Sequence, residues 1–315
     1  MKIVYQIQEE EYKYRFQPLL FNTSRHRKLQ SPEAWYSFYL IDEQKHEIWA
    51  EFHVCHSANA LNSPLRAPYG GFSANSMLGQ ERFDHFSKEV AESIEIPTLS
   101  SIEIKVPPHL FDNQVVTWQE NILCELGYKI NNKDPHWFLP ITGSSYTSKL
   151  KSTEYKRKLN RLRENNFLFK VETLDEYLDA YRFISDCMRG KGYKISMSEK
   201  DFVQYLEKIP DDIRVFSVFF ENKRVAASIC FKVNETTLYD FMHAHLREMD
   251  THSPVLKLFD GIYEYGRNHM FHYLDMGTAS LEGKPNYPLI HFKELAGGII
   301  QNKFIWGKDI NPSIR

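Results

Sequence analysis

Thr237-Leu-Tyr-Asp-Phe-Met-His-Ala-His245 is followed, after a polar connection, by Ser253-Pro-Val-Leu-Lys-Leu-Phe-Asp-Gly-Ile-Tyr-Glu-Tyr-Gly266 and then by Phe271-His-Tyr-Leu-Asp-Met-Gly277. The first and last of these segments are rich in aromatic and branched residues, which predicts strands. Ser is a favoured N-cap and Pro suits the first helical position, so the middle segment is predicted to be a helix that begins at Ser253-Pro254. Free backbone donors and the helix dipole make such a start a candidate anion site, with Ser253 as its side chain.

The bulk composition is that of a soluble globular protein with two domains. The chain has 315 residues, of which 42% are hydrophobic and 25% charged, and no window approaches the roughly 20 apolar residues of a membrane span. A net charge of −2 argues against a nucleic-acid or membrane footprint over the whole surface, but it is compatible with a local basic patch. The four cysteines form no CxxC pair and the N-terminus has no apolar leader, so we expect reduced thiols in a cytoplasmic protein.

The predicted elements occur in the same order twice, although the two halves share negligible sequence identity. Each half has a hairpin, a third strand, a helix with a Ser at its start, a further strand and another helix. The first hairpin covers residues 35–54 and the second covers residues 215–233. We therefore expect a mixed α/β protein with two tandem domains of similar topology, at 1–145 and 146–315.

A strongly basic helix is predicted over residues 147–165. Three apolar residues recur at helical spacing and form its buried stripe, while Lys and Arg cover the remainder. Arg157 and Arg161 lie four residues apart on one face, where like charges repel slightly, so a bound anion would stabilise the helix. The anion could belong to a phosphate, to CoA or to tRNA; the alternative is a solvated charged face.

Three motifs occur in an order that spans nearly the whole chain. They are Pro68-Tyr-Gly-Gly-Phe72, the basic stretch Tyr155-Lys-Arg-Lys-Leu-Asn-Arg-Leu-Arg163, and Tyr273-Leu-Asp-Met-Gly-Thr278 followed by Asn286-Tyr-Pro-Leu-Ile-His-Phe-Lys-Glu-Leu-Ala-Gly-Gly298. In this order they resemble the FemAB family, the peptidoglycan-bridge aminoacyltransferases, and the related acetyltransferases that share its double GNAT fold. The resemblance implies two tandem GNAT-like domains with a cleft between them, the first on the acceptor side and the second on the donor side.

The resemblance also implies an N-acyltransferase in which an amine attacks the acyl carbonyl directly, with no tightly bound cofactor. An acyl-CoA is the first candidate for the donor co-substrate. Aminoacyl-tRNA, used in cell-wall precursor synthesis, is the alternative, and a tRNA contact through the basic helix at 147–165 would fit it. The acceptor would be a small-molecule amine or a peptidoglycan-precursor amine.

Two departures from the family pattern bear on the donor. The acetyl-CoA enzymes carry a Gly-rich pyrophosphate loop before the second-domain helix, where this chain has Arg247-Glu-Met-Asp-Thr-His-Ser-Pro254 and no glycine. FemAB-type enzymes often carry an inserted helical arm that contacts tRNA, and the sequence has no such insertion. A catalytically silent GNAT-fold protein that only binds a ligand is therefore a third interpretation.

Three residues are candidates for the chemistry of acyl transfer, which needs a neutral amine and a polarised carbonyl. Asp275 ends a predicted strand and could deprotonate or orient the amine, or it could cap the following turn. Lys293 matches, by the resemblance, a lysine near the donor that would stabilise an oxyanion or a phosphate; a solvated surface lysine is the alternative. His243 and His245 alternate to one strand face, and His243 is the first acid/base candidate.

The acceptor side is predicted around Arg66, Tyr69, Gly70 and Gly71. Arg66 could bind an anionic acceptor through two guanidinium nitrogens. Tyr69 and the two glycines predict a close approach of the backbone to a ligand or to the neighbouring helix, and a bulge is the alternative. No metal is predicted, because no set of ligands has the spacing of a metal site.

Overall fold

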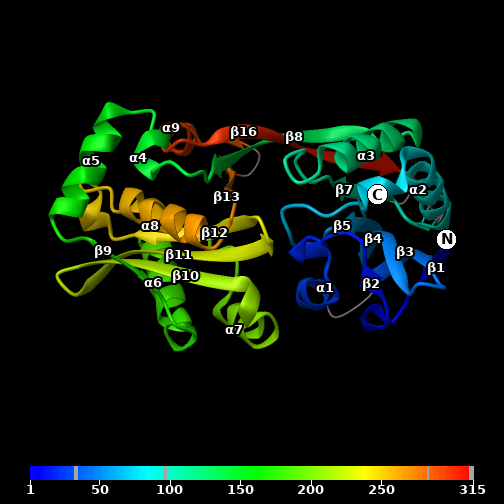
Figure 1. The fold of residues 1–315 in the computed structure, drawn as a ribbon, viewed down its shortest axis with the longest axis horizontal. Helices are drawn as coiled ribbons and strands as arrows, with labels where there is room; N and C mark the ends of the chain where they lie inside the picture. Colours follow the sequence, from blue (N-terminus) through cyan, green and yellow to red (C-terminus); the bar gives the residue numbers. More distant parts are fainter. Residues whose placement is uncertain (32–34, 95–97, 282–283, 312–315) are drawn as a thin grey trace. The chain divides into compact units, whose positions relative to one another are not determined.

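The computed structural model describes residues 1–31, 35–94, 98–281 and 284–311 of the chain, and Figure 1 shows it as a ribbon. The described chain is divided between two compact units, each with helices and a mixed sheet. Among the described helices, none is both long enough and apolar enough to cross a membrane.

The two units do not divide the chain at a single point. The first unit contains Met1–Pro135 and the segment that begins at Gln301, and the second contains His136–Ile300. The expected domains were 1–145 and 146–315, so the division lies earlier and the end of the chain returns to the first unit. This return depends on a strand pairing between residues that are far apart in the sequence, which local periodicity does not signal.

The sheet of the first unit has the strand order β1-β3-β4-β5-β7-β16, with β2 and β6 paired to β4. Its elements are β1 (Lys2–Tyr5), β2 (Lys13–Tyr14), α1 (Ser24–Gln30), β3 (Trp35–Asp42), β4 (Glu47–Ser57), β5 (Ala60–Ser63), β6 (Ser73–Ala74), α2 (Gln80–Ile94), β7 (Ser101–Lys105) and α3 (Asn113–Glu125). The unit also contains β8 (Lys129–Pro140) as far as Pro135 and β16 (Ile299–Asp309) from Gln301 onward.

The predicted hairpin of the first unit is present as β3 and β4, which pair antiparallel along their length. β5 and β7 pair parallel, and α2 is the crossover between them. α3 begins after Asp112, because the Asp112 carboxylate accepts hydrogen bonds from the amides of Gln114 and Val115, both at 3.0 Å. The helices α2 and α3 and one face of the sheet enclose an apolar core rich in aromatic rings.

A cluster of ionisable side chains is buried in the first unit. Glu51 and His53 on β4 are 0% and 1% exposed, with the Glu51 Oε2 and His53 Nε2 atoms 3.1 Å apart. Burial raises the pKa of Glu51 to about 8 and lowers the pKa of His53 well below its usual range, so both groups are mostly neutral at pH 7. The Tyr14 hydroxyl contacts Glu51 at 2.9 Å and Glu9 at 3.1 Å, and Glu9 forms an ion pair with Arg27.

The raised pKa of Glu51 predicts a pH-dependent stability. The folded chain holds a proton on Glu51 that the unfolded chain releases between the ordinary pKa of 4.5 and about 8. The stability from this proton is complete below pH 4.5 and is lost as the pH rises through about 8. Since burial lowers the pKa values of His26 and His53 from 6.5, those groups contribute no slope above that pH. The unfolding free energy from chemical denaturation should therefore fall between pH 6.5 and 8.

The variant Glu51→Gln should remove this slope, because glutamine stays neutral at every pH. Glu43 belongs to the same hairpin and has a side chain that is 57% exposed, so Glu43→Gln is the matched control and should keep the slope. A Glu51→Gln protein with the slope of the wild type would show that the pH dependence comes from another group.

The sheet of the second unit has the strand order β9-β10-β11-β12-β13-β8. Its elements are α4 (Tyr146–Lys149), α5 (Thr153–Glu164), β9 (Leu168–Val171), α6 (Tyr177–Gly190), α7 (Glu199–Lys208), β10 (Ile213–Phe220), β11 (Lys223–Asn234), β12 (Thr237–His245), α8 (Val255–Asn268), β13 (Tyr273–Thr278), β14 (Ser280–Leu281), β15 (Lys284–Pro285) and α9 (Tyr287–Leu295).

The second unit repeats the element order of the first, as the sequence predicts. β10 and β11 form the hairpin, β12 pairs antiparallel with β11, and β13 pairs parallel with β12. α8 is the crossover between the two parallel strands, as α2 is in the first unit. α8 packs against strands β9 to β13 and α6 against β10 to β12; Figure 1 shows the two helices on opposite faces of this sheet.

The predicted basic helix is in fact two helices, α4 and α5. Leu150 is the C-cap of α4 and has an extended conformation, and Ser152 caps α5 by accepting a hydrogen bond from the Tyr155 amide at 3.3 Å. The prediction of one continuous helix over 147–165 is therefore wrong at this point, because a serine cap starts a new helix within it.

Candidate functional site

Strands β12 and β13 pair over three residues and then separate. Thr237, Leu238 and Tyr239 pair in parallel with residues 273–275. Beyond these pairs the described residues of the two strands do not pair with each other, because β12 continues along β11 and β13 continues along β8. Crevices outside the carboxyl ends of parallel strands are common ligand sites, so this separation marks the candidate site.

A bulge in β12 places Asp240 and His243 on one face of the strand. Residues three apart on a regular strand point to opposite faces, but Phe241 is an extra residue in the register with β11 and shifts the alternation. The Nδ1 atom of His243 is 2.6 Å from Oδ2 of Asp240, and the Ser228 hydroxyl donates to Oδ1 of the same carboxylate at 2.7 Å. The Asp240 side chain is 1% exposed and that of His243 is 22% exposed.

A second bulge lies in β13, between Asp275 and Gly277. Asp275 is fully buried, and its Oδ1 accepts a hydrogen bond from the Gly277 amide at 2.8 Å and lies 2.5 Å from Nε2 of His136 on β8. A carboxylate that accepts from the amide two residues later stabilises the turn of its own chain, which is the alternative role that the sequence suggests for Asp275. Asp275 thus lies at the candidate site and also holds the bulge in place.

Lys293 on α9 is bound to the backbone of the same bulge. Its ammonium donates to the carbonyl oxygens of Met276 at 2.6 Å, Gly277 at 3.1 Å and Thr278 at 2.5 Å. Because an ammonium has three N–H donors, these carbonyls occupy all of them. Lys293 would have to release a carbonyl before it could donate to an oxyanion or a phosphate.

The environment of Lys293 is apolar but contains two carboxylates. The residue is 3% exposed, so the interpretation as a solvated surface lysine is wrong, and its Nζ lies 5.7 Å from the centre of the Trp137 ring. Burial lowers the pKa of Lys293 to about 8, and the charges of Asp240 and Asp275 oppose this effect. Both carboxylates of the separated strands therefore act on this ammonium.

Loss of the Lys293 ammonium should destabilise the second unit. In Lys293→Met the three carbonyls lose their donor, and each unsatisfied buried acceptor costs about 1–3 kcal/mol. We expect the unfolding free energy from urea denaturation to fall by several kcal/mol, whereas Lys200→Met, an exposed lysine of α7, should change it by less than about 0.5 kcal/mol. Equal denaturation midpoints for the two variants would show that the carbonyl contacts do not stabilise the fold.

One aromatic pair connects His243 to α9, the helix that carries Lys293. The Phe259 ring of α8 is 5.5 Å from the His243 ring and 5.7 Å from the ring of Phe292, the residue before Lys293. The Tyr155 ring of α5 is in turn 6.1 Å from Phe292. The basic helix α5 is therefore packed directly against the helix that carries Lys293.

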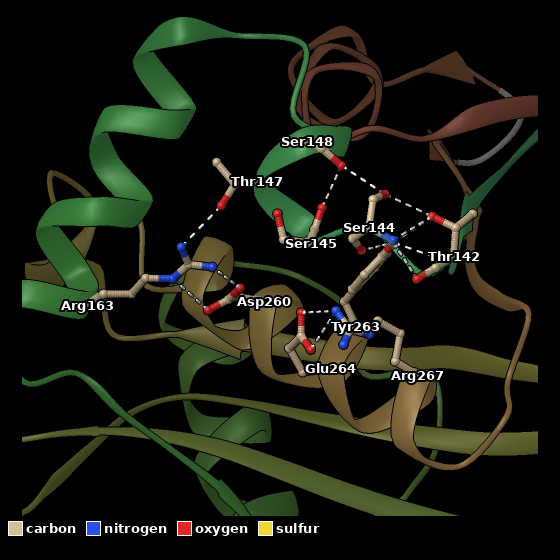
Figure 2. Close-up of polar contacts among 10 residues, drawn as sticks. All are labelled: Thr142, Ser144, Ser145, Thr147, Ser148, Arg163, Asp260, Tyr263, Glu264 and Arg267. Carbon is tan, nitrogen blue, oxygen red and sulfur yellow. Dashed lines mark hydrogen bonds and ion pairs between the residues drawn. The ribbon is translucent and has the colours of Figure 1, made fainter.

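The exposed face of α5 carries Arg157 and Arg161, and neither forms an ion pair with any described residue. Arg163 of the same helix binds Asp260 of α8 through two contacts, Nε to Oδ2 at 3.2 Å and a terminal nitrogen to Oδ1 at 2.6 Å (Figure 2). This bidentate pair fixes α5 on α8. The two exposed arginines are therefore presented to solvent on a helix that is itself held in place.

The loop before α4 is bound to the same helix. The Tyr263 hydroxyl of α8 accepts from the Thr142 amide at 3.0 Å and donates to the Ser144 carbonyl at 3.0 Å (Figure 2). α8 thus supports both the basic helix α5 and the loop that leads to α4.

Ser253 is not the N-cap of α8. The helix begins at Val255 with Pro254 as its cap residue, and Ser253 has a positive φ of 56°. The loop before it forms a 3₁₀ turn at Arg247–Met249, and the amides of residues 249, 250, 252 and 253 donate to carbonyls of the same loop. The N-cap prediction is wrong because this turn uses the chain's own carbonyls, and those amides are not free for a phosphate.

In the first unit Arg66 and Tyr69 have very different surroundings. Arg66 is exposed, and its amide donates to Oε1 of Gln30 at 3.0 Å. Tyr69 is 0% exposed, with its ring 5.1 Å from the Phe21 ring and 5.0 Å from the Phe111 ring. Tyr69 is therefore a core residue in this structure, and Arg66 is the predicted acceptor residue that solvent can reach.

The close approach predicted at Gly70 and Gly71 is present, and the neighbour is the chain itself. A Cβ at Gly70 would lie 2.9 Å from Pro64, and one at Gly71 would lie 2.2 Å from Oε1 of Gln119 on α3. That oxygen accepts a hydrogen bond from the Phe72 amide at 2.8 Å. Gly71 thus allows the chain to pass close to the neighbouring helix, as the sequence predicts, and Gly70 allows it to pass close to Pro64.

Gly71→Ala should destabilise the first unit more than Gly127→Ala. Both glycines have positive φ, 75° and 82°, where an alanine strains the backbone by roughly 1–2 kcal/mol. A Cβ at Gly127 meets no atom within 4 Å, whereas one at Gly71 displaces Gln119 from a buried amide. Thermal denaturation should show the larger loss for Gly71→Ala, and equal losses would mean that Gln119 moves without cost.

The structure gathers only some of the predicted site residues. Asp275, Lys293 and His243 lie near the point where β12 and β13 separate, whereas Arg66, Tyr69, Gly70 and Gly71 belong to the first unit. Asp240 and His136 are functional candidates that sequence reasoning missed, because bulges and cross-strand contacts leave no periodic signal. The described residues contain no cluster of three or more metal-ligating side chains.

No protein-family model matches the chain, and no curated protein sequence matches it. Solved structures match its fold. FemX has a TM-score of 0.76 at 11% identity, over 100% of this chain and 98% of FemX. The C-terminal domain of a putative lysylphosphatidylglycerol synthetase from Agrobacterium fabrum has a TM-score of 0.57 at 11% identity, over 91% and 88% of the two chains. L-PGS from Bacillus licheniformis has a TM-score of 0.53 at 14% identity, over 86% and 83%.

At these identities the similarity establishes the fold and leaves the substrate open. The match covers 98% of FemX and 100% of this chain, so it includes both units. The resemblance expected from the three motifs is confirmed at this level: the chain is a mixed α/β protein with a FemAB-like, tandem GNAT fold.

Proposed function

We propose that the chain is an acyltransferase that transfers an aminoacyl group from aminoacyl-tRNA to an amine. The acceptor is a peptidoglycan-precursor amine or a small-molecule amine, which attacks the acyl carbonyl directly. Support comes from the FemAB-like fold and from the ionisable groups gathered where the two parallel strands separate. Because aminoacyl-tRNA is a cytoplasmic substrate, the proposed activity belongs in the cytoplasm.

The observation that carries the choice of donor is the loop before α8. A pyrophosphate cradle needs backbone N–H groups that point at the anion and are free to bind it. In this loop four amides are already bonded to carbonyls of the loop, and Pro254 has no N–H at all. Acyl-CoA, the first donor expected from the sequence, would find five consecutive or near-consecutive positions, residues 249, 250 and 252–254, without a free N–H for its pyrophosphate.

The basic helix offers another way to bind a polyanionic donor. Arg157 and Arg161 are exposed and form no ion pair among the described residues, and α5 packs against the helix that bears Lys293. Guanidinium groups bind phosphate bidentately at the end of a long side chain. If the phosphates of a tRNA acceptor stem lay along α5, the aminoacylated end of the RNA would be directed towards the site.

The names of the similar proteins agree with an aminoacyl donor. FemX has the greatest TM-score of the three structures described above. One of the others is by name a putative lysylphosphatidylglycerol synthetase, an enzyme whose product carries a lysyl group. On the acceptor side, Arg66 is proposed to bind an anionic group of the acceptor through its exposed guanidinium.

The proposal predicts that the chain binds charged RNA through α5 and uses it as donor. Label from aminoacyl-tRNA should pass to an amine acceptor, tested with a UDP-linked peptidoglycan-precursor peptide and a panel of small amines, and read by chromatography. In Arg157→Glu/Arg161→Glu the affinity for an aminoacylated acceptor-stem RNA, measured by fluorescence anisotropy, should fall about tenfold or more. The slope of log affinity against log salt should decrease by about 2.

The charge-matched control is Lys200→Glu/Lys208→Glu, which reverses two exposed charges on α7 of the same unit and should leave RNA affinity nearly unchanged. Acetyl-CoA and longer acyl-CoA thioesters should give no thermal stabilisation at concentrations where the RNA does. Saturable stabilisation by a CoA thioester, with acyl transfer from it, would instead support the CoA donor. Binding of RNA without any transfer would support the silent binding protein.

A further inference from the structure

We propose that His243 accepts the proton of the attacking amine and that Asp240, not Asp275, is the residue that positions it. This inference rests on the proposed acyl transfer and assigns the proton step within it. It depends on the bulge at Phe241, since only the shifted alternation brings Asp240 and His243 to one face of β12.

The contacts of Asp240 determine which nitrogen of His243 is basic. An ionised carboxylate can only accept a hydrogen bond. The Nδ1 atom that contacts Asp240 therefore carries the proton, and Nε2 carries the lone pair. Ser228 donates to the other oxygen of Asp240, which fixes the carboxylate and therefore the imidazole ring. The Nε2 atom has no partner among the described residues, and the side chain is 22% exposed, so a substrate amine can reach it.

The neighbouring residues do not offer another base or a nucleophile. Asp275 is fully buried and is held by the Gly277 amide and by His136. Ser228 does not have the arrangement of an activated nucleophile, because its hydroxyl binds the carboxylate and not the imidazole. Burial raises the pKa of the Cys230 thiol well above its usual range, so Cys230 is not a thiolate nucleophile.

The proposed step balances as an aminolysis of an ester. The amine nitrogen forms a bond to the acyl carbon while His243 Nε2 takes the amine proton. The bond from the acyl carbon to the terminal ribose oxygen of the tRNA then breaks, and the imidazolium returns the proton to that oxygen. The products are an amide and uncharged tRNA, and no oxidant, reductant or further co-reactant is needed.

Several ionisable groups face the Asp240–His243 pair and will shape its pH response. They are Cys230 on β11, Tyr239 and His245 on β12, and Lys293 on α9, and Asp275 on β13 acts in turn on Tyr239 and Lys293. His245 also contacts Asp250, with Nε2 and Oδ1 2.8 Å apart, and Lys191 at the end of α6. Asp250→Asn is therefore a matched control: it breaks an aspartate–histidine contact of the same strand without touching Asp240.

The first measurement needs no substrate. Long-range ¹H–¹⁵N correlation spectra of the whole protein, with the His243 signals assigned by their loss in His243→Gln, report which ring nitrogen carries the proton. We expect the Nδ1–H form in the wild type and its loss in Asp240→Asn, because an asparagine amide can donate to Nδ1. The Nε2–H form in the wild type would overturn the proposal.

The second measurement is single-turnover transfer from aminoacyl-tRNA to the amine acceptor across a range of pH. Asp240→Asn and His243→Gln should each slow transfer by about a hundredfold or more, with little change in the half-saturating acceptor concentration. Asp250→Asn should keep a rate within about twofold of the wild type.

The outcomes separate the two proposals. If Asp240→Asn does not fold, His243→Gln, whose side chain is partly exposed, carries the test alone. Transfer in both variants within twofold of the wild type, or an equal loss in Asp250→Asn, would overturn the assignment of His243. An absence of transfer in the wild type would defeat the aminoacyl-tRNA donor, while the tautomer measurement would still judge the Asp240–His243 pair.

Discussion

The separation of β12 from β13 after three residue pairs is the constraint on which the second unit depends. Two neighbouring parallel strands that part leave backbone donors and acceptors without their ladder partners, and buried polar groups of this kind must bind something else. The chain meets this need on the β13 side with one side chain, because the Lys293 ammonium binds three successive carbonyls at the bulge. The carbonyls at the end of β13 are therefore satisfied only when α9 is in place, because Lys293 connects this helix to the strand end.

The charges at this point are coupled, which explains why so many ionisable groups occur together. A lysine that is 3% exposed is unfavourable as a cation, and its pKa falls to about 8. The carboxylates of Asp240 and Asp275 favour the charged form, so each offsets part of the cost of burying the ammonium. Asp240 also binds His243, so a change at Asp240 alters both the lysine and the histidine, and single substitutions there will not be additive.

The sequence predicts the fold of this chain better than it predicts the site. The repeated element order and the two hairpins follow from local patterns, and the structure confirms them. What local patterns miss is non-local or depends on a register: the final strand that returns to the first unit, the bulge at Phe241, and the bulge before Gly277. On a regular strand Asp240 and His243 would point to opposite faces, so no reading of spacing alone pairs them. Ser253 shows the converse, because a favourable Ser-Pro start was overridden by a turn that satisfies its own amides.

The closed loop before α8 changes how a donor can be recognised on this fold. Main-chain amides at a helix start bind one phosphate group at a fixed position, which suits a small, rigid pyrophosphate. Arginines on an exposed helix face reach several ångströms further and can adapt to phosphates spaced along a strand, which suits a nucleic acid. Arg157 and Arg161 are one helical turn apart on a helix that Arg163 fixes to α8, so their positions are set by the fold although their side chains are exposed. A long polyanion that spans both arginines gains from each contact, and this is the physical reason why the proposed donor is an RNA and not a coenzyme.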